Sequence, residues 1–351
     1  MPPDLVVVLC DTARADAFRP WGGPQPTPTM ERLAREGVRY SDAIAAAPWT
    51  LPSITSIFSG RLPSQHGVTN ECVEWVNDNP TSPDRSIRAM AGPWLPEELK
   101  ARGYRTWAAS CNIWISTWGG YDRGFDRFVD LQDNVRLPQG RWGRFARKAM
   151  RVGGRADRGG RATTQEFRRA LAEPDPAPLF AFVNLMEVHT PLNPPRPYYP
   201  YPPWRRASTL RLSGASKGDR PFLVYTLGVA EPPPEYTTTL RTLYYGSARY
   251  EDALLGSFVQ AIEERGRPTV LVVVSDHGEN LGERGLYGHH SSLSEELLQV
   301  PLAAWGHRVD VAAGPVDGPV SLLGLSSWLT GLADGDGAPL SPQDTVVSEY
   351  E

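Results

Sequence analysis

A threonine lies at the start of a short helix that could bind an anion. Pro52 suits the first turn of a helix, where its missing N–H has no partner to lose, and residues 50–59 favour a tightly packed helix that ends near Gly60. The hydroxyl of Thr50 would then lie beside unpaired backbone N–H groups and the positive end of the helix dipole. Thr50 either caps this helix, which is the commoner role, or is a nucleophile that faces a bound phosphate or sulfate.

Acidic residues and a histidine directly follow two valine-rich runs. Asp11 comes after residues 5–9, and Asp276 and His277 come after residues 269–275. Ligands bind at the carboxyl ends of strands in an open parallel sheet, so these side chains are expected at one edge. A lone aspartate after a strand is usually a turn residue. Two carboxylates with an imidazole, however, suit one divalent cation, and mainly oxygen donors favour Mg²⁺, Mn²⁺ or Ca²⁺ over zinc.

The elements that would position these residues alternate between strands and helices. The expected strands are 5–9, 38–40, 104–109, 179–183 and 269–275, and the expected helices are 29–36, 50–59 and 93–102. This order predicts an α/β fold with a mostly parallel central sheet that has helices on both faces. Residues 191–234 are rich in proline and tyrosine and are expected to form a long ordered loop over the strand ends.

Composition excludes several classes of protein. The 351 residues suffice for one large domain, and a net charge of −4 argues against a nucleic-acid partner. The three cysteines, Cys10, Cys72 and Cys111, form neither a disulfide framework nor a zinc site, and Cys10 is expected in the core. The run 5–9 is too short for a signal sequence, and no run is long enough to span a membrane. A cytoplasmic protein with no integral membrane segment is therefore expected.

The segment 136–161 is rich in arginine and glycine and has two interpretations. It could be a basic helix that contacts an anionic substrate or lipid headgroups. The commoner alternative is a solvated insertion with a few aromatic anchors.

Four segments together resemble the sulfatase family of the alkaline phosphatase superfamily. They are 8–16 (VLCDTARAD), 48–53 (PWTLPS) with 59–67 (SGRLPSQHG), 182–191 (FVNLMEVHTP) and 275–289 (SDHGENLGERGLYGH). The resemblance implies an alkaline phosphatase-like catalytic domain over residues 1–310. It also implies that residues 311–351 begin a C-terminal subdomain that is short or truncated.

The resemblance implies a role for individual residues. Asp11, Asp276 and His277 match positions that bind a metal, which would also contact Thr50. Three further positions match catalytic residues. His189 matches the histidine that protonates the leaving-group oxygen, and His289 matches a lysine or histidine that contacts the anion. Asn112 resembles an asparagine that holds a phosphoryl oxygen in related phosphodiesterases. A register shift of one would put His290 in place of His289. His66 is expected to bond within its turn, and Glu279 and Glu283 are not expected to bind the metal.

Three positions depart from the pattern of typical sulfatases. Thr50 replaces a cysteine or serine that becomes formylglycine, Ile54 replaces an arginine, and Thr12 replaces a second acid. Threonine cannot yield an aldehyde, so the formylglycine mechanism is excluded. The set of Asp11, Thr50, Asp276 and His277 resembles instead single-metal phosphoglycerol and phosphoethanolamine transferases.

The leading hypothesis is a hydrolase that cleaves phosphate or sulfate esters with one divalent metal and Thr50 as nucleophile. Its substrate would be a small molecule, or an ester on a glycan or a lipid headgroup. A sulfuric ester hydrolase or a transferase is the first alternative. A catalytically weak protein that only binds anions is the second.

Overall fold

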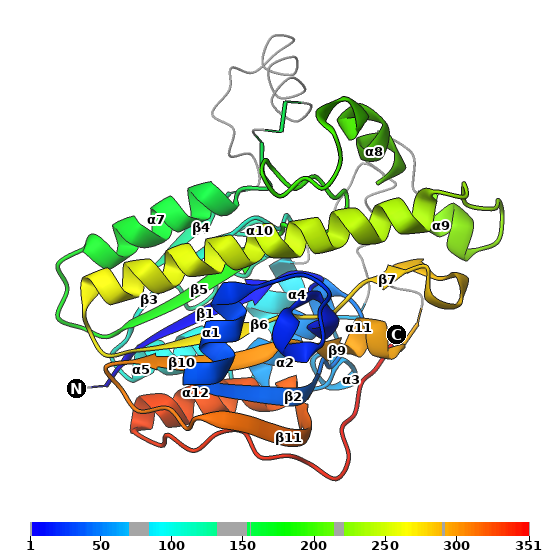
Figure 1. Ribbon diagram of the computed structural model, residues 1–351. Helices are drawn as coiled ribbons and strands as arrows, with labels where there is room; N and C mark the ends of the chain where they lie inside the picture. The colour runs from blue at the N-terminus through cyan, green and yellow to red at the C-terminus, as the bar shows by residue number, and fades with distance from the viewer. Residues whose placement is uncertain are drawn as a thin grey trace.

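A nine-stranded sheet forms the centre of the part of the chain that the computed structural model describes, which is residues 2–69, 84–131, 153–154, 156–213, 221–289 and 292–350 (Figure 1). In spatial order the strands are β11 (Gly314–Ser321), β2 (Val38–Ile44), β10 (Leu302–His307), β6 (Thr269–Val274), β1 (Asp4–Cys10), β5 (Leu179–Leu185), β3 (Arg105–Ser110) and β4 (Arg127–Asp130). The short strand β9 (Gln299–Val300) pairs with β2.

Most neighbouring strands are parallel, which confirms the expected fold class. Strand β1 lies between β5 and β6 and is parallel to both, and β3 continues the parallel arrangement between β5 and β4. Strand β10 is antiparallel to both β6 and β2, and β9 is antiparallel to β2. The antiparallel direction arises because the chain turns back beside β6 without a crossover helix.

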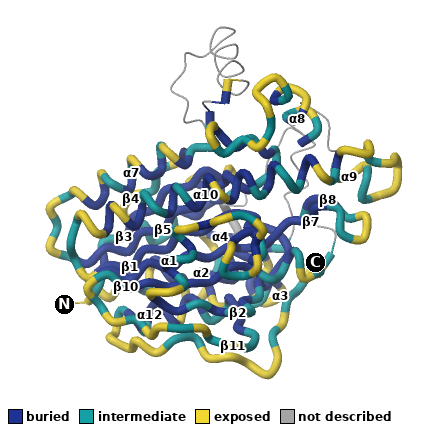
Figure 2. The backbone as a smooth tube through the Cα atoms, viewed as in Figure 1, coloured by how far each residue is buried: buried dark blue, intermediate teal, exposed yellow. Residues whose placement is uncertain are grey.

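Helices cover both faces of the sheet, and β1 is buried on both sides (Figure 2). Its residues Val6, Val8 and Cys10 pack in a core with α1 (Pro28–Glu36), α7 (Gly160–Ala172) and α10 (Tyr236–Arg265). The alternate residues of β1 pack in a second core with α2 (Thr50–Ser59), α5 (Leu95–Ala101) and α12 (Leu325–Asp334). The expected core position of Cys10 is confirmed, since this residue is fully buried.

The shorter elements lie mainly in the connections. They are η1 (Ala15–Ala17), η2 (Arg19–Trp21), α3 (Pro63–His66), α4 (Asp84–Ala89), η4 (Pro203–Arg205), α8 (Arg206–Leu212), α9 (Pro221–Thr226), β7 (Asn280–Leu281), η5 (Glu283–Gly285), β8 (Tyr287–Gly288), α11 (Glu295–Leu298) and η6 (Leu322–Gly324). No helix among the described residues has both the length and the apolar character needed to cross a membrane.

Residues 191–234 are not simply a loop, because η4, α8 and α9 lie within them. Arg206 at the start of α8 is buried, and its guanidinium donates to Asn193 Oδ1 and to the carbonyl of Pro194. The same guanidinium lies 3.9 Å from the centre of the Tyr199 ring. The proline-rich segment therefore packs around an arginine from a helix, an arrangement that its composition does not reveal.

Several features expected from the sequence lie outside the described residues or stay untested. Cys72, His290 and most of the basic segment 136–161 are not among the described residues. Within residues 311–351, β11 pairs with β2 at the edge of the main sheet, and α12 packs on the core beside α2. The boundary at residue 310 stays a prediction.

Candidate active site

Two adjacent strands bring three potential metal ligands together. Strands β1 and β6 are parallel and in register, with Leu9 opposite Val274, so the residues after them emerge side by side. The ligand atoms of Asp11, Asp276 and His277 all lie within 4.8 Å of one another, and all three residues are fully buried. The expected convergence at one edge of the sheet is therefore present.

Two asparagines orient the carboxylate of Asp11. Asn112, just after β3, donates from Nδ2 to Asp11 Oδ2 at 2.7 Å, and Asn184 in β5 donates to the same oxygen at 3.3 Å. The other oxygen, Oδ1, is buried and has no hydrogen-bond partner among the described residues. Both donors thus hold one oxygen of Asp11 and leave the second directed elsewhere.

The carboxylate of Asp276 is arranged in the same way. Its Oδ1 accepts from the backbone N–H groups of Thr12 at 3.3 Å and His277 at 3.0 Å. Its Oδ2 is buried and has no hydrogen-bond partner in the described part of the chain. Oδ2 lies 3.5 Å from Nε2 of His277. Nδ1 of His277 faces the carbonyl of Gly278 at 2.8 Å and must donate to it. In the neutral ring Nε2 therefore carries the lone pair, which is the form that binds a metal.

These residues fit a divalent cation. Burial raises the pKa of Asp11 and of Asp276, and the negative charge of Asp11 raises the pKa of Asp276 further. Two buried carboxylates so close together cannot both stay ionised without a nearby positive charge. One orphaned oxygen from each aspartate and one imidazole nitrogen are donors that a divalent cation accepts. Asp11, Asp276 and His277 would hold such an ion.

Thr50 lies beside this cluster and does not cap its helix. The N-cap of α2 is Trp49, and the Thr50 hydroxyl instead lies 3.2 Å from Nε2 of His277. Ser53, one turn along the helix, donates from Oγ to the carbonyl of Asp276 at 2.6 Å. This bond fastens the start of α2 to the end of β6. The structure thus favours a role for Thr50 in the site over the capping alternative.

Three histidine rings gather around the same point. The ring of His289 lies 4.7 Å from that of His277 and 5.1 Å from that of His189, measured between centroids. Nδ1 of His189 faces the carbonyl of Thr190 and donates to it, so Nε2 is on the opposite edge of the ring. His66 is elsewhere: its Nδ1 accepts from the N–H of Val68 within its turn, as expected.

Other polar residues hold the site in place and were not predicted from the sequence. The hydroxyl of Tyr244 on α10 donates to the carbonyl of Thr12 at 2.8 Å and accepts from the N–H of Arg14 at 2.9 Å. Thr12 has a φ of 62°, a left-handed conformation that a β-branched residue rarely adopts. Asn184 was also missed, although it is a polar residue in the otherwise apolar run of β5, which is a usable signal.

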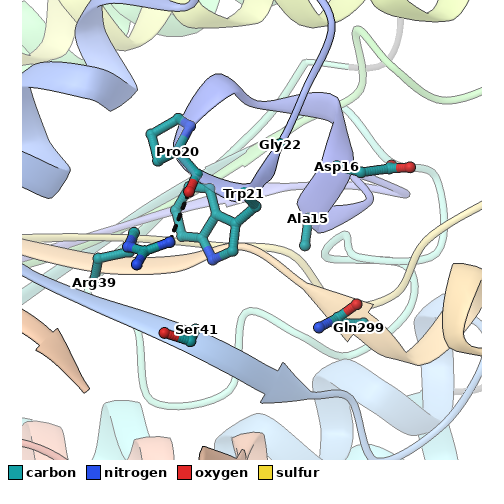
Figure 3. A pocket seen from close by; sticks show the side chains of 8 residues that line it. All are labelled: Ala15, Asp16, Pro20, Trp21, Gly22, Arg39, Ser41 and Gln299. Carbon is teal, nitrogen blue, oxygen red and sulfur yellow. Dashed lines mark hydrogen bonds between the residues drawn. The ribbon is translucent and has the colours of Figure 1, made fainter. Parts of the chain in front are cut away.

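A separate surface pocket lies beside η1 and η2. It has a volume of about 310 Å³ and is lined by residues that include Trp21, Arg39 and Gln299 (Figure 3). None of the residues of the metal cluster or of the histidine group lines it. The residues predicted to carry the chemistry therefore lie in the buried cluster at the sheet edge and do not line this pocket.

The chain belongs to the sulfatase family, since the family model described as Sulfatase matches residues 3–334. A sulfatase of Formosa agariphila is 23% identical over 335 residues, which cover 88% of this chain and 64% of that protein. An arylsulfatase of Klebsiella aerogenes is 22% identical, with 79% of this chain and 66% of that protein covered. The chain thus spans about two thirds of the length of these relatives.

Solved structures share the fold. The phosphonate monoester hydrolase of Silicibacter pomeroyi superposes with a TM-score of 0.67 at 19% identity, covering 95% of this chain and 73% of that one. The C-terminal periplasmic domain of EptC from Escherichia coli, crystallised with zinc, gives a TM-score of 0.63 at 16% identity, covering 99% and 90%. These similarities confirm the alkaline phosphatase-like fold expected from the sequence.

Proposed function

We propose that this chain hydrolyses phosphate or sulfate esters, with Thr50 as the nucleophile and one divalent cation held by Asp11, Asp276 and His277. The observation that carries the proposal is the 3.2 Å distance between Thr50 Oγ1 and Nε2 of His277, one of the three members of the ligand cluster. Thr50 is buried, with 4% of its surface exposed, and its hydroxyl contacts a member of the ligand cluster.

The residues divide the chemistry between them. When bound, the cation would act as a Lewis acid that lowers the pKa of a contacting hydroxyl and offsets negative charge on the ester. Thr50 Oγ1 loses its proton to water and forms a bond to phosphorus or sulfur, while the bond to the leaving oxygen breaks. Water then hydrolyses the threonine ester and regenerates the hydroxyl. The N–H groups at the start of α2 would stabilise the developing charge.

Two histidines and an asparagine complete the proposed machinery. His189 gives a proton to the leaving oxygen, and His289 contacts an oxygen of the bound anion. Asn112 donates to Asp11 and so fixes a metal ligand. Its additional contact with a phosphoryl oxygen stays a prediction.

The identity of the nucleophile distinguishes this chain from a formylglycine enzyme. Thr50 cannot be oxidised to an aldehyde, and the buried Ile54 stands where the maturation pattern has an arginine. Direct attack by a hydroxyl is therefore the proposed route. Phosphodiesters are favoured over sulfate esters because threonine attack resembles the phosphoryl-transferring members of the superfamily.

The substrate class is proposed as a small molecule or an ester on a glycan or lipid headgroup. One fold neighbour was solved with its substrate D-glucosamine-2-N,6-O-disulfate, and another is a phosphoethanolamine transferase domain from Campylobacter jejuni. A sulfuric ester hydrolase and a phosphoryl transferase are accordingly the alternative functions. The cytoplasmic location expected from the sequence stays a prediction.

A substrate screen tests the proposal. The purified protein is assayed with aryl phosphomonoesters, phosphodiesters, phosphonate monoesters and sulfates, each with Mg²⁺, Mn²⁺, Ca²⁺ or Zn²⁺, beside Thr50→Ala and Thr50→Ser variants. We expect turnover of a phosphodiester that Thr50→Ala lowers by at least about 10³-fold and Thr50→Ser partly preserves. Equal turnover by wild type and Thr50→Ala would rule out the proposed nucleophile. Metal analysis that shows no bound divalent ion would favour a protein that only binds anions.

A further inference from the structure

Glu279 is a buried carboxylate next to the metal cluster that the reaction described above does not use. It follows His277 by two residues, and its side chain is only 1% exposed. A carboxylate removed from water is strongly unfavourable unless hydrogen-bond donors or positive charges surround it. Glu279 therefore requires a partner inside the site.

The imidazole of His289 is that partner. Nδ1 of His289 lies 3.3 Å from Oε1 and 3.4 Å from Oε2 of Glu279, so the ring nitrogen faces both carboxylate oxygens. Carboxylate oxygens accept hydrogen bonds from an imidazole N–H, so this geometry places a ring hydrogen of His289 on Nδ1. Arg14 is close on the other side of this segment, but it donates to the backbone carbonyl of Glu279.

This contact determines which atom of His289 is presented to the site. With Nδ1 turned toward Glu279, Nε2 is on the opposite edge of the ring. That ring lies against those of His277 and His189, and His277 in turn contacts the Thr50 hydroxyl.

We propose that Glu279 is a positioning residue that acts through His289: its carboxylate fixes the ring so that Nε2 is presented to an oxygen of the bound ester. This inference rests on the proposed function. It adds a residue for which the only expectation from the sequence is that it does not bind the metal. A purely structural carboxylate would affect folding and leave the contribution of His289 to the reaction unchanged.

A double-mutant cycle separates the two roles. Glu279→Gln keeps the size and an acceptor oxygen but removes the charge, and Glu295→Gln makes the same change on the exposed side of α11 as a matched control. We expect Glu279→Gln to lower kcat by about 10–100-fold, with KM and bound metal within about twofold of wild type. In a His289→Ala background the same change should alter kcat by less than about twofold. Equal losses in both backgrounds would show that Glu279 does not act through His289.

Nuclear magnetic resonance of the histidine rings tests the contact without any assay of activity. The chain has only six histidines, so long-range ¹H–¹⁵N spectra can be assigned with single His→Ala variants. We expect His289 to carry a hydrogen on Nδ1 in wild type and its ring signals to shift in Glu279→Gln but not in Glu295→Gln. An Nδ1 without hydrogen would overturn the proposal. Should no ester be turned over, the proposed function fails, and these spectra still decide whether the Glu279–His289 contact exists.

Discussion

Thr50 Oγ1 and His277 Nε2 lie 3.2 Å apart although 227 residues separate them in the chain. The contact exists because α2 begins directly over the carboxyl end of β6, where Ser53 is bonded to the carbonyl of Asp276. Thr50, the candidate nucleophile at the start of α2, therefore lies in the same buried region as the candidate metal ligands that follow β1 and β6. The following predictions test what this arrangement does.

The carboxylates that bind the metal should lower the thermal stability of the metal-free protein. Without the cation, one of the two buried carboxylates must bind a proton, which costs free energy at neutral pH. Asp276→Asn is neutral without this proton, so in the presence of a chelator the variant should be more thermostable than wild type. With Mn²⁺ added, wild type should gain stability and the variant should not, because one ligand oxygen is lost. Thermal unfolding with and without metal measures both effects. A variant that is less stable than wild type in chelator would contradict the cost of burying Asp11 and Asp276 together without a cation.

Loss of the general acid should depend on the leaving group. His189→Ala should lower kcat by about 10²–10⁴-fold for an alkyl ester, whose leaving oxygen needs a proton. For a nitrophenyl ester, which leaves as a stable anion, the loss should be at least tenfold smaller. Parallel kinetics on the two esters measure this difference. An equal loss on both substrates would assign His189 to binding and not to proton transfer.

The Tyr244 hydroxyl should stabilise the strained turn after Asp11. Tyr244→Phe leaves a buried carbonyl at Thr12 and a buried N–H at Arg14 without their partner, which costs about 1–3 kcal/mol. Tyr245→Phe is the matched control, since the Tyr245 hydroxyl forms no hydrogen bond with a described residue. Urea unfolding of both variants gives the free energy of unfolding. Similar stabilities for the two variants would show that the Tyr244 bonds do not hold this turn.

His66 should make unfolding depend on pH in a defined window. Burial lowers the pKa of His66 from 6.5 to about 4, and Nδ1 accepts a bond from Val68 that a protonated ring cannot accept. Between pH 6.5 and 4 the unfolded chain therefore binds more protons at this residue, so the stability that neutral His66 gives above this window is lost as pH falls. Near pH 5, the His66→Gln variant should therefore bind about one proton fewer on unfolding than the wild-type protein does. The measurement is the urea midpoint of unfolding at several pH values for both proteins. If this midpoint changed with pH equally in wild type and His66→Gln, His66 would not have the lowered pKa.

Part of the fold and site could be predicted from local sequence alone. Asp11, Asp276 and His277 were predictable because each follows a valine-rich strand, and strand ends meet at one edge of a parallel sheet. Thr50 was predictable because Pro52 and Gly60 delimit a helix around it. These signals depend only on neighbouring residues.

The rest depends on packing that the sequence does not display. Tyr244 lies in the 30-residue helix α10, which is buried on a wide face and has no clear amphipathic period. The contact of Glu279 with His289 requires the turn between β7 and β8 to fold back, because the paired strands place Asn280 opposite Gly288. Strand β10 was missed because its antiparallel direction follows from a chain reversal and not from a local pattern.

The central claim is that Thr50 forms a covalent bond to the ester, and an acid-quench experiment tests it most directly. The metal-loaded His189→Ala variant is mixed with a nitrophenyl phosphodiester, quenched in acid and digested, and the peptide that contains Thr50 is weighed by mass spectrometry. We expect this peptide to gain the mass of the transferred phosphoryl ester group, and the Thr50→Ala, His189→Ala double variant to show no gain. An unmodified Thr50 peptide together with continued turnover by Thr50→Ala would contradict the account.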